Sequence, residues 1–123
     1  MRYKARLVAK GFTQQLGQDY NKTYAPVIQM DTLRVILALV LVKKLKVHQM
    51  DIKGAYLNGI LKETIYMDQP EWFNDETRRV CHLIKSIYGL KQSGREWNTK
   101  LDKQLTCYGL WKLISGFPSL PFG

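Results

Sequence analysis

Residues 47 to 59 read Val-His-Gln-Met-Asp-Ile-Lys-Gly-Ala-Tyr-Leu-Asn-Gly, and this is the most informative stretch of the sequence. Its first half predicts a strand over residues 47–53, and its second half predicts a short helix or turn over residues 55–61. A carboxylate at a strand end, next to a glycine that lets another backbone approach, is typical of metal-dependent phosphoryl-transfer sites. Asp51 is therefore the first candidate for chemistry.

Upstream of this stretch, the sequence predicts a strand, a connection and a helix. Residues 2–10 alternate basic with other side chains, as a strand does, and residues 11–26 contain the glycines and the proline of a looping connection. The apolar run Val35–Val42 is much shorter than the roughly 20 residues that span a bilayer. We therefore expect a buried helix over about residues 31–45, with Asp31 as its N-cap.

Downstream, two strands and a second helix are expected. The strands cover residues 64–67 and 80–84, and the Trp72-Phe73 pair is expected to anchor the loop between them. The helix covers about residues 93–105. Apolar residues recur in it every four positions and define a buried stripe: Trp97, Leu101 and Leu105. These elements predict an α+β fold in which an antiparallel sheet packs with helices.

The length of the chain, 123 residues, is enough for one modest domain and too little for two. We expect this domain to cover residues 1–107. Residues 108–123 are rich in glycine and proline, carry almost no charge and lack a clean periodicity. We expect this tail to lie outside the domain.

The charge of the chain favours a polyanionic partner. Lysine and arginine number 19 against 10 aspartates and glutamates, and the formal net charge of +9 favours a nucleic acid over a merely soluble basic surface. The opening residues contain no acid before Asp19, and a strand would place Arg2, Lys4 and Arg6 on one face, with Lys10 beyond them. That face either grips phosphates or is a solvated strand face.

Neither the cysteines nor the histidines have the spacing of a metal site. Cys81 and Cys107 lie far apart, which favours a reducing, intracellular setting. His48 and His82 are better explained as strand-face residues than as metal ligands. Met1 is followed by alternating basic residues rather than by an apolar run, so no signal peptide is expected.

A further block, Tyr88-Gly-Leu-Lys-Gln-Ser-Gly-Arg-Glu-Trp97, carries groups suited to holding a nucleotide. Lys91 and Arg95 offer positive charge, and Gln92 offers an amide that both donates and accepts hydrogen bonds. Gly94 allows another backbone or a ligand to approach closely. The last residue of the block, Trp97, is better explained as a core residue than as a platform for base stacking.

Four blocks of the sequence occur in order: Arg-Tyr-Lys-Ala-Arg-Leu-Val-Ala-Lys-Gly-Phe-Thr-Gln (2–14), His-Gln-Met-Asp-Ile-Lys-Gly-Ala-Tyr-Leu-Asn-Gly (48–59), Ile-Tyr-Met-Asp-Gln-Pro (65–70) and Ser-Ile-Tyr-Gly-Leu-Lys-Gln-Ser-Gly-Arg-Glu-Trp (86–97). Together they resemble the reverse transcriptase of copia-type long-terminal-repeat retrotransposons. Four ordered blocks at compatible spacing are much more specific than any one of them. The resemblance covers about residues 2–106.

This resemblance implies an RNA-directed DNA polymerase of right-hand architecture, to which the chain would supply the fingers and the first part of the palm. Such enzymes join a primer 3′-hydroxyl to the α-phosphate of a deoxynucleotide with two magnesium ions. Asp51 matches the first catalytic, metal-binding aspartate, and the backbone carbonyl of Ile52 matches a further metal ligand. Tyr56 matches the side chain that excludes a ribose 2′-hydroxyl, with an aromatic of the palm core as the alternative.

The same resemblance implies which residues contact nucleotide and nucleic acid. Lys4 and Arg6 match residues that hold the triphosphate, and Gln92 matches a pocket residue that positions the sugar or the templating pair. Contacts with phosphates of the nucleic acid are expected from four further cations: Arg2, Lys10, Lys91 and Arg95. The implied partners are deoxynucleotides and an RNA or DNA template-primer, in a cytoplasmic particle or the nucleus and without a membrane.

The chain departs from the family in its last part. Nothing in residues 98–123 resembles the Tyr-x-Asp-Asp hairpin that supplies the other two carboxylates, and two divalent ions need several anionic oxygens. We therefore expect a fragment of a Pol polyprotein that lacks the protease, integrase and ribonuclease H and is inactive alone. Two alternatives stay open. One is a non-catalytic nucleic-acid-binding remnant, and the other is a chain that does not fold stably because half a palm sheet leaves an unpaired edge.

Overall fold

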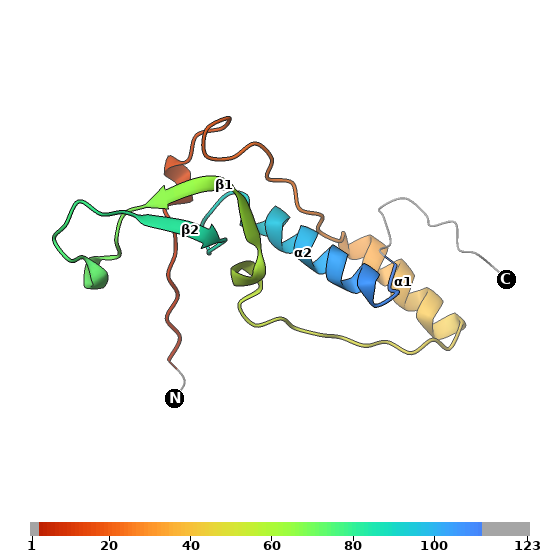
Figure 1. Cartoon of the computed structure of the whole chain (residues 1–123). Coiled ribbons are helices and arrows are strands. Elements are labelled where there is room, and N and C mark those ends of the chain that lie inside the picture. The colour runs from red at the N-terminus through yellow and green to blue at the C-terminus, as the bar shows by residue number, and fades with distance from the viewer. Residues whose placement is uncertain (1–2, 112–123) are drawn as a thin grey trace.

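The computed structural model describes residues 3–111 as an α+β fold of two helices and a two-stranded antiparallel sheet (Figure 1). The elements are helix α1 (Met30–Val42), strand β1 (Ile60–Met67), strand β2 (Cys81–Lys85) and helix α2 (Ser93–Cys107). Short 3-10 helices accompany them as η1 (Gly11–Thr13), η2 (Ala55–Asn58) and η3 (Glu71–Phe73). The predicted α+β class is confirmed.

Strands β1 and β2 form a hairpin in which Tyr66 lies opposite His82, with their ring centroids 5.3 Å apart. The register shifts between Ile60 and Ile65 because one strand carries an irregularity there. Alternate side chains of β1 face the core, so Ile65 is buried while Tyr66 is exposed. Both predicted strands are confirmed.

The loop between the two strands does not have the predicted aromatic anchor. Trp72 is 91% exposed and Phe73 is 80% exposed, so the anchoring role predicted for this pair is wrong. The loop that carries the pair extends away from the core in Figure 1.

The apolar core of the described residues is small. Its buried members are Ile65, Ile87 and Leu90, against which Leu83 and Met67 pack while still partly exposed. Four polar residues of this region are buried as deeply: Ser86, Gln92, Ser93 and Glu96. A buried polar group destabilises a fold unless it has a hydrogen-bond partner. The stability of this fold therefore depends on the partners of those four side chains.

Residues 86–89 directly follow β2. This 86–89 segment lies against two other parts of the backbone. The Ser86 N–H donates to the Gly59 carbonyl at 2.9 Å, and a Cβ on Gly59 would lie 2.6 Å from Ser86 Oγ and 3.0 Å from the backbone of α2. On its other side, the segment accepts a hydrogen bond at 2.8 Å from the Ala9 N–H to the Tyr88 carbonyl. Only glycine fits at position 59, because the space for a side chain is already filled.

Two predicted strands are wrong. Residues 3–10, the N-terminal arm, pair through one isolated bridge between Val8 and Tyr88, and residues 47–53 are irregular and exposed. A strand satisfies its N–H and C=O groups through the ladder of a neighbouring strand. Within residues 3–111, neither segment has such a ladder.

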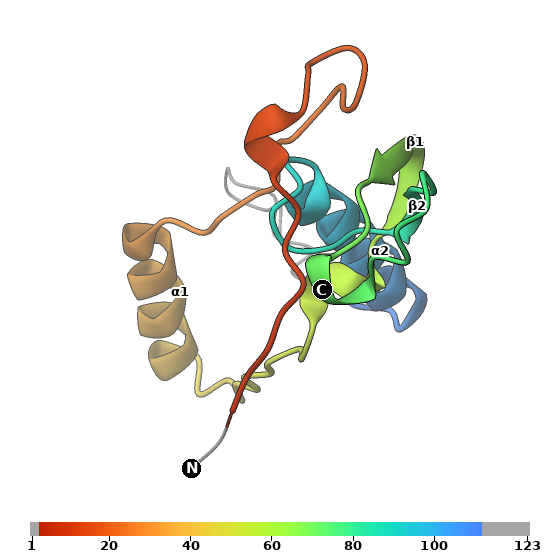
Figure 2. The ribbon, with the colours of Figure 1, turned by 90° about the vertical axis from the view of Figure 1, so that its left-hand side faces the viewer.

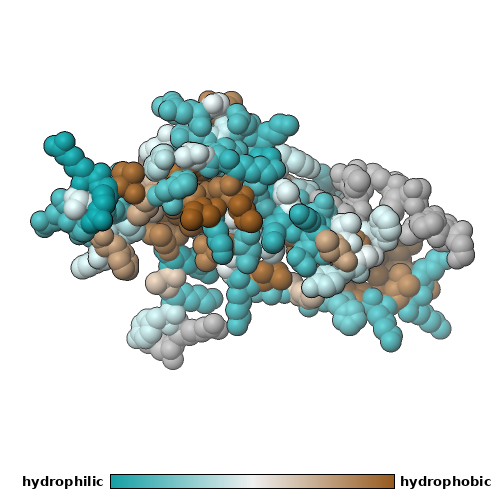
Figure 3. All heavy atoms as spheres, viewed as in Figure 1, coloured by the Kyte–Doolittle hydropathy of each residue, from teal (hydrophilic) through white to brown (hydrophobic). Residues whose placement is uncertain are grey.

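Helix α1 confirms the predicted helix but not its burial. Gln29 is the N-cap instead of Asp31, which lies in the first turn and pairs with Arg34 at 3.3 Å. No residue of α1 is buried, and in Figure 2 the helix stands apart from α2 and the hairpin. Every residue from 35 to 42 is apolar, and Figure 3 shows hydrophobic atoms at the surface on the side of the molecule where Figure 1 places α1. A helix that is apolar all round normally lies in a core. Helix α1 therefore exposes an apolar surface of the kind that is normally buried.

Helix α2 confirms the predicted second helix and runs two residues further, to Cys107. Its apolar stripe is only partly buried: Trp97, Leu101 and Leu105. The buried positions of α2 are instead Ser93 and Glu96, near its N-terminus. The helix is thus attached to the fold mainly through its first turn.

Two glycines with positive φ test how much the fold depends on the approach of the arm to the 86–89 segment. A Cβ on Gly89 (φ +94°) would lie 2.1 Å from the Ala9 carbonyl oxygen, whereas a Cβ on Gly17 (φ +84°) meets nothing within 4 Å. We expect Gly17→Ala to cost about 1–2 kcal/mol, from left-handed strain alone. Gly89→Ala should cost more, by about 2 kcal/mol, because it also separates the arm from Tyr88. Urea unfolding followed by circular dichroism measures both, and equal midpoints for the two variants contradict the prediction.

Candidate functional site

Two of the predicted site residues, far apart in the sequence, meet on the ring of Tyr88. The Arg6 guanidinium carbon lies 5.6 Å from the centroid of this ring, within the range of a cation–π contact. The Tyr56 ring packs against the same ring, with centroids 4.9 Å apart and planes inclined by 55°. The predicted triphosphate-binding arginine and the predicted sugar gate therefore lie beside one aromatic side chain.

Local backbone contacts hold Tyr56 in place. Gly54, at φ +62°, turns the chain into η2, and the Asn58 side-chain amide donates to the Gly54 carbonyl at 3.1 Å. The Ser86 hydroxyl, which is fully buried, donates a hydrogen bond to the Tyr56 carbonyl. Tyr56 itself is half-buried, so one part of it packs and another part reaches solvent.

Asp51 lies away from secondary structure, in the irregular segment between α1 and η2, and is exposed. Its neighbour Ile52 is 44% exposed. Within residues 3–111, no group of three histidines, cysteines, aspartates or glutamates is placed so that it could hold a metal ion. The carboxylate of Asp51 therefore stands without the acidic partners that a two-metal site requires.

Gln92 is fully buried, and both ends of its amide are engaged. Its Oε1 accepts a hydrogen bond from Gln14 Nε2 at 3.1 Å, and its Nε2 donates to the Asp19 carbonyl at 3.0 Å. Gln14 is held in turn, because its Oε1 accepts from the Lys91 N–H at 2.8 Å. In this conformation Gln92 joins the 14–20 loop to the start of α2, and its amide does not face solvent.

Lys91 holds the same loop from outside. Its Nζ donates to the Gln14 carbonyl at 3.1 Å and to the Tyr20 hydroxyl at 3.3 Å, and lies 4.9 Å from the centroid of the Tyr20 ring. The loop is also closed on itself, since the Gly17 N–H donates to the Tyr20 carbonyl at 2.9 Å. Lys91 remains exposed.

Arg95 is engaged inside the protein by two carboxylates. Its Nη1 lies 3.0 Å from Glu96 Oε1 and 3.9 Å from Glu63 Oε1, and the Glu63 and Glu96 side chains are only 14% and 2% exposed. Neither glutamate was identified as a site residue from the sequence. The sequence did contain a pattern that could have identified Glu63. In a strand, residues 61, 63 and 65 share one face, so Glu63 lies on the inward face of β1 with Leu61 and Ile65.

The remaining predicted contacts are spread along the arm. Lys4 is exposed, and Lys10 lines a cleft of about 790 Å³ between the arm and the hairpin, together with Leu7, Ile65 and Leu90. Arg2 lies outside the described residues.

A sequence profile of the family described as reverse transcriptase (RNA-dependent DNA polymerase) matches residues 1–115. The chain belongs to this reverse transcriptase family. It is 49% identical over 104 residues to the retrovirus-related Pol polyprotein from transposon TNT 1-94 of Nicotiana tabacum, a match that covers 83% of the chain and 8% of the relative. It is 43% identical over 116 residues to that of transposon RE2 of Arabidopsis thaliana, covering 93% of the chain and 8% of the relative.

Similarity extends to yeast. The chain is 39% identical over 110 residues to the Transposon Ty1-ER2 Gag-Pol polyprotein of Saccharomyces cerevisiae, covering 84% of the chain and 6% of the relative. This reverse transcriptase chain thus spans less than a tenth of the length of these relatives. The resemblance to the copia-type element is confirmed, and the chain is a fragment of such a reverse transcriptase domain. No solved structure matches it.

Two negative observations apply to the described part of this reverse transcriptase fragment. Reverse transcriptases use divalent metal ions, but the carboxylates within residues 3–111 do not fit a two-ion site. No helix in the same part of the chain is long and apolar enough to cross a membrane.

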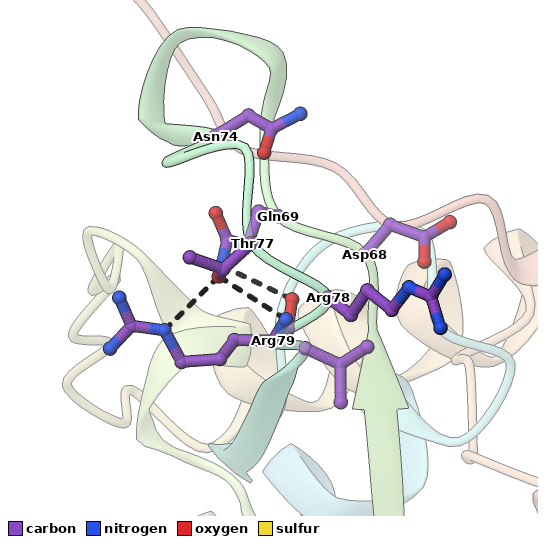
Figure 4. Close-up of a pocket in the computed structure, with 7 residues that line it drawn as sticks. Asp68, Gln69, Asn74, Thr77, Arg78 and Arg79 are labelled. Carbon is purple, nitrogen blue, oxygen red and sulfur yellow. Dashed lines mark hydrogen bonds between the residues drawn. The ribbon is translucent and has the colours of Figure 1, made fainter.

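The hairpin loop of the fragment forms a second, smaller pocket of about 250 Å³ (Figure 4). Arg78 and Arg79 lie on opposite sides of this loop, and Asp68 lies on the side of Arg78. The Thr77 hydroxyl donates to the Asp75 carboxylate, which also pairs with Arg79. The hydrogen bond from Thr77 is the main cause that holds the pKa of Asp75 below its usual value.

This lowered pKa predicts how the hairpin loop responds to acid. A carboxyl whose pKa is lower in the folded state contributes stability above its unfolded pKa, near 4, and loses it as the pH falls through the folded pKa. We expect Thr77→Val to raise the pKa of Asp75 toward its ordinary value, as measured by the carboxyl carbon shift in an NMR titration. Thr99→Val is the matched control, because the Thr99 hydroxyl donates to the Arg95 carbonyl and to no carboxylate. Equal Asp75 titrations in the two variants would contradict the prediction.

Proposed function

We propose that this chain supplies the nucleotide-selecting part of a reverse transcriptase active site and does not polymerise DNA by itself. The observation that carries the proposal is the meeting of Arg6 and Tyr56 on Tyr88. The family resemblance assigns these two residues to the triphosphate and to the sugar of one nucleotide, and a nucleotide can contact both only if they lie close together. The family match, to reverse transcriptase (RNA-dependent DNA polymerase), supports the proposed reaction class, the joining of deoxynucleotides to a primer on an RNA or DNA template.

In this proposal the arm meets the phosphates. The Arg6 guanidinium pairs with phosphate oxygens in a fork, and Lys4 adds a second, exposed cation. Tyr56 lies beneath the sugar, where its ring leaves no room for a 2′-hydroxyl. Gln92 supports this site indirectly, because its buried amide holds the 14–20 loop that follows the arm. The surrounding architecture is that of a right-hand polymerase, with this chain in the fingers and the start of the palm.

Asp51 is the carboxylate that this chain adds to the metal-binding set of the polymerase, with the Ile52 carbonyl beside it. Support comes from its position five residues before Tyr56, in the block that matches the family. One carboxylate cannot hold two divalent ions, because several anionic oxygens must share their charge. The isolated chain is therefore proposed to be inactive.

A second candidate function is non-catalytic binding of nucleic acid. The net charge of +9 and the exposed cations of the arm favour it. Exposed Lys10 and Lys91 remain in the proposal as phosphate contacts. Arg95 is less available, because a phosphate would have to compete with Glu96 and Glu63 for its guanidinium.

Primer extension tests the catalytic part of the proposal. The purified 123-residue chain, given a primer-template, deoxynucleotides and magnesium, should extend no primer because the metal-binding set is incomplete. An active reverse transcriptase under the same conditions is the positive control. Template-dependent product from the chain, lost in Asp51→Asn, would show that the proposed inactivity is wrong.

Salt dependence of binding tests the nucleic-acid part. Lys4→Ala/Lys10→Ala should weaken binding to a primer-template and reduce the slope of log K against log salt by about 1.5, as expected for two lost phosphate contacts. Lys100→Ala/Lys103→Ala removes the same charge from exposed positions of α2 and should change the slope much less. Asp51→Asn should not weaken binding. A slope that is the same in both double variants contradicts the role of the arm.

A further inference from the structure

Tyr88 contacts more of the candidate site than its sequence block indicated. Its ring carries the Arg6 guanidinium at 5.6 Å and the Tyr56 ring at 4.9 Å. Its carbonyl accepts the Ala9 N–H at 2.8 Å, and it pairs with Val8 in an isolated bridge. The side chain and the backbone of Tyr88 therefore contact both the arm and Tyr56, the proposed sugar gate.

The neighbours of Tyr88 hold its backbone in place. Ser86 is fully buried and bonds to the carbonyl of Tyr56, and buried Ile87 accepts a hydrogen bond from the hydroxyl of Ser93. Gly89 lies so close to Ala9 that it leaves no room for a side chain. These contacts hold the backbone on both sides of Tyr88, and from this held position its ring contacts Arg6 and Tyr56.

We infer that Tyr88 is a positioning residue for sugar selection, which acts through Arg6 and Tyr56 without touching the nucleotide. This inference rests on the proposed function. A gate excludes a 2′-hydroxyl only if the triphosphate is held at a set distance from the ring of the gate. Tyr88 lies between the group that holds the triphosphate and the ring that tests the sugar, so it sets that distance. Loss of its ring lets the sugar shift away from Tyr56.

The test compares nucleotides that differ only in the 2′-hydroxyl. The 123-residue chain is titrated with dCTP, CTP and inorganic tripolyphosphate, without metal and at low salt, and binding is followed by NMR signals of Arg6 and Tyr56. The wild-type chain should bind tripolyphosphate and should prefer dCTP to CTP. Tyr88→Leu should lower tripolyphosphate affinity about two- to fivefold, as expected for an exposed cation–π contact, and should bring the ratio of dCTP to CTP affinity toward one.

Two variants control for the ring and for the fold. Tyr88→Phe keeps the aromatic ring and should keep both the affinity and the ratio. Tyr66→Leu removes another aromatic, an exposed one that packs on His82 of the hairpin, and should change neither. A residue with a merely structural role would lower both nucleotide affinities together, so the ratio is the deciding measurement.

Three outcomes overturn the inference. In the first, Tyr88→Leu lowers dCTP and CTP affinity equally and leaves the ratio unchanged, while the proposed function stands. In the second, the wild-type chain binds neither tripolyphosphate nor dCTP, and the proposed function falls with the inference. The third needs no substitution: the side-chain methylene protons of Arg6 show no upfield ring-current shift in the folded wild-type chain, which would place them away from Tyr88.

Discussion

The close approach of the 86–89 segment to two other stretches of backbone is the constraint on which the rest of the structure depends. Gly59 and Gly89 each face an atom that a side chain would displace, so η2 and the arm can approach this segment only because both positions lack a Cβ. The position of Tyr56 follows from the first approach and the position of Arg6 from the second. The geometry of the candidate site is thus set by main-chain packing, and the apolar core, with three buried side chains among the described residues, contributes less to it.

Polar groups occupy the interior positions that apolar side chains fill in most small domains. Gln92 has a partner at each end of its amide, and the Ser86 and Ser93 hydroxyls donate to backbone carbonyls. Glu96 is satisfied less completely, since it pairs with Arg95 but its Oε1 has no well-aligned hydrogen bond. A buried polar group that loses its partner costs about 1–3 kcal/mol. Such an interior selects one arrangement of the chain strongly, because any other arrangement leaves these groups unpaired.

Local patterns in the sequence predicted the two strands and α2 well, since short strand-like runs and the four-residue period after Ser93 are properties of the segments themselves. The segments expected to be strands at 2–10 and 47–53 also have strand-like patterns, but in the part of the chain that the structure describes, residues 3–10 and 47–53 lack a neighbouring ladder. A local pattern does not report whether such a neighbour exists. For the site, residue types and the family blocks identified Arg6 and Tyr56 as candidates. They did not reveal that Tyr88 joins them, or that Gln92 and Arg95 are engaged inside the protein, because burial and pairing depend on segments that are distant in the sequence.

The hydrogen bonds between the 14–20 loop and residues 91 and 92 join positions 77 and 78 residues apart. A ribosome adds about 5–20 residues per second. Residues 91 and 92 are therefore synthesised roughly 4 to 15 s after the 14–20 loop to which they bond. During that time the arm lacks its contacts with Tyr88, and the apolar residues of α1, which precede the hairpin in the sequence, have already been made. Formation of this part of the fold therefore depends on contacts of large sequence separation, which form late, and the arm is made well before the residue whose ring and carbonyl it contacts, Tyr88.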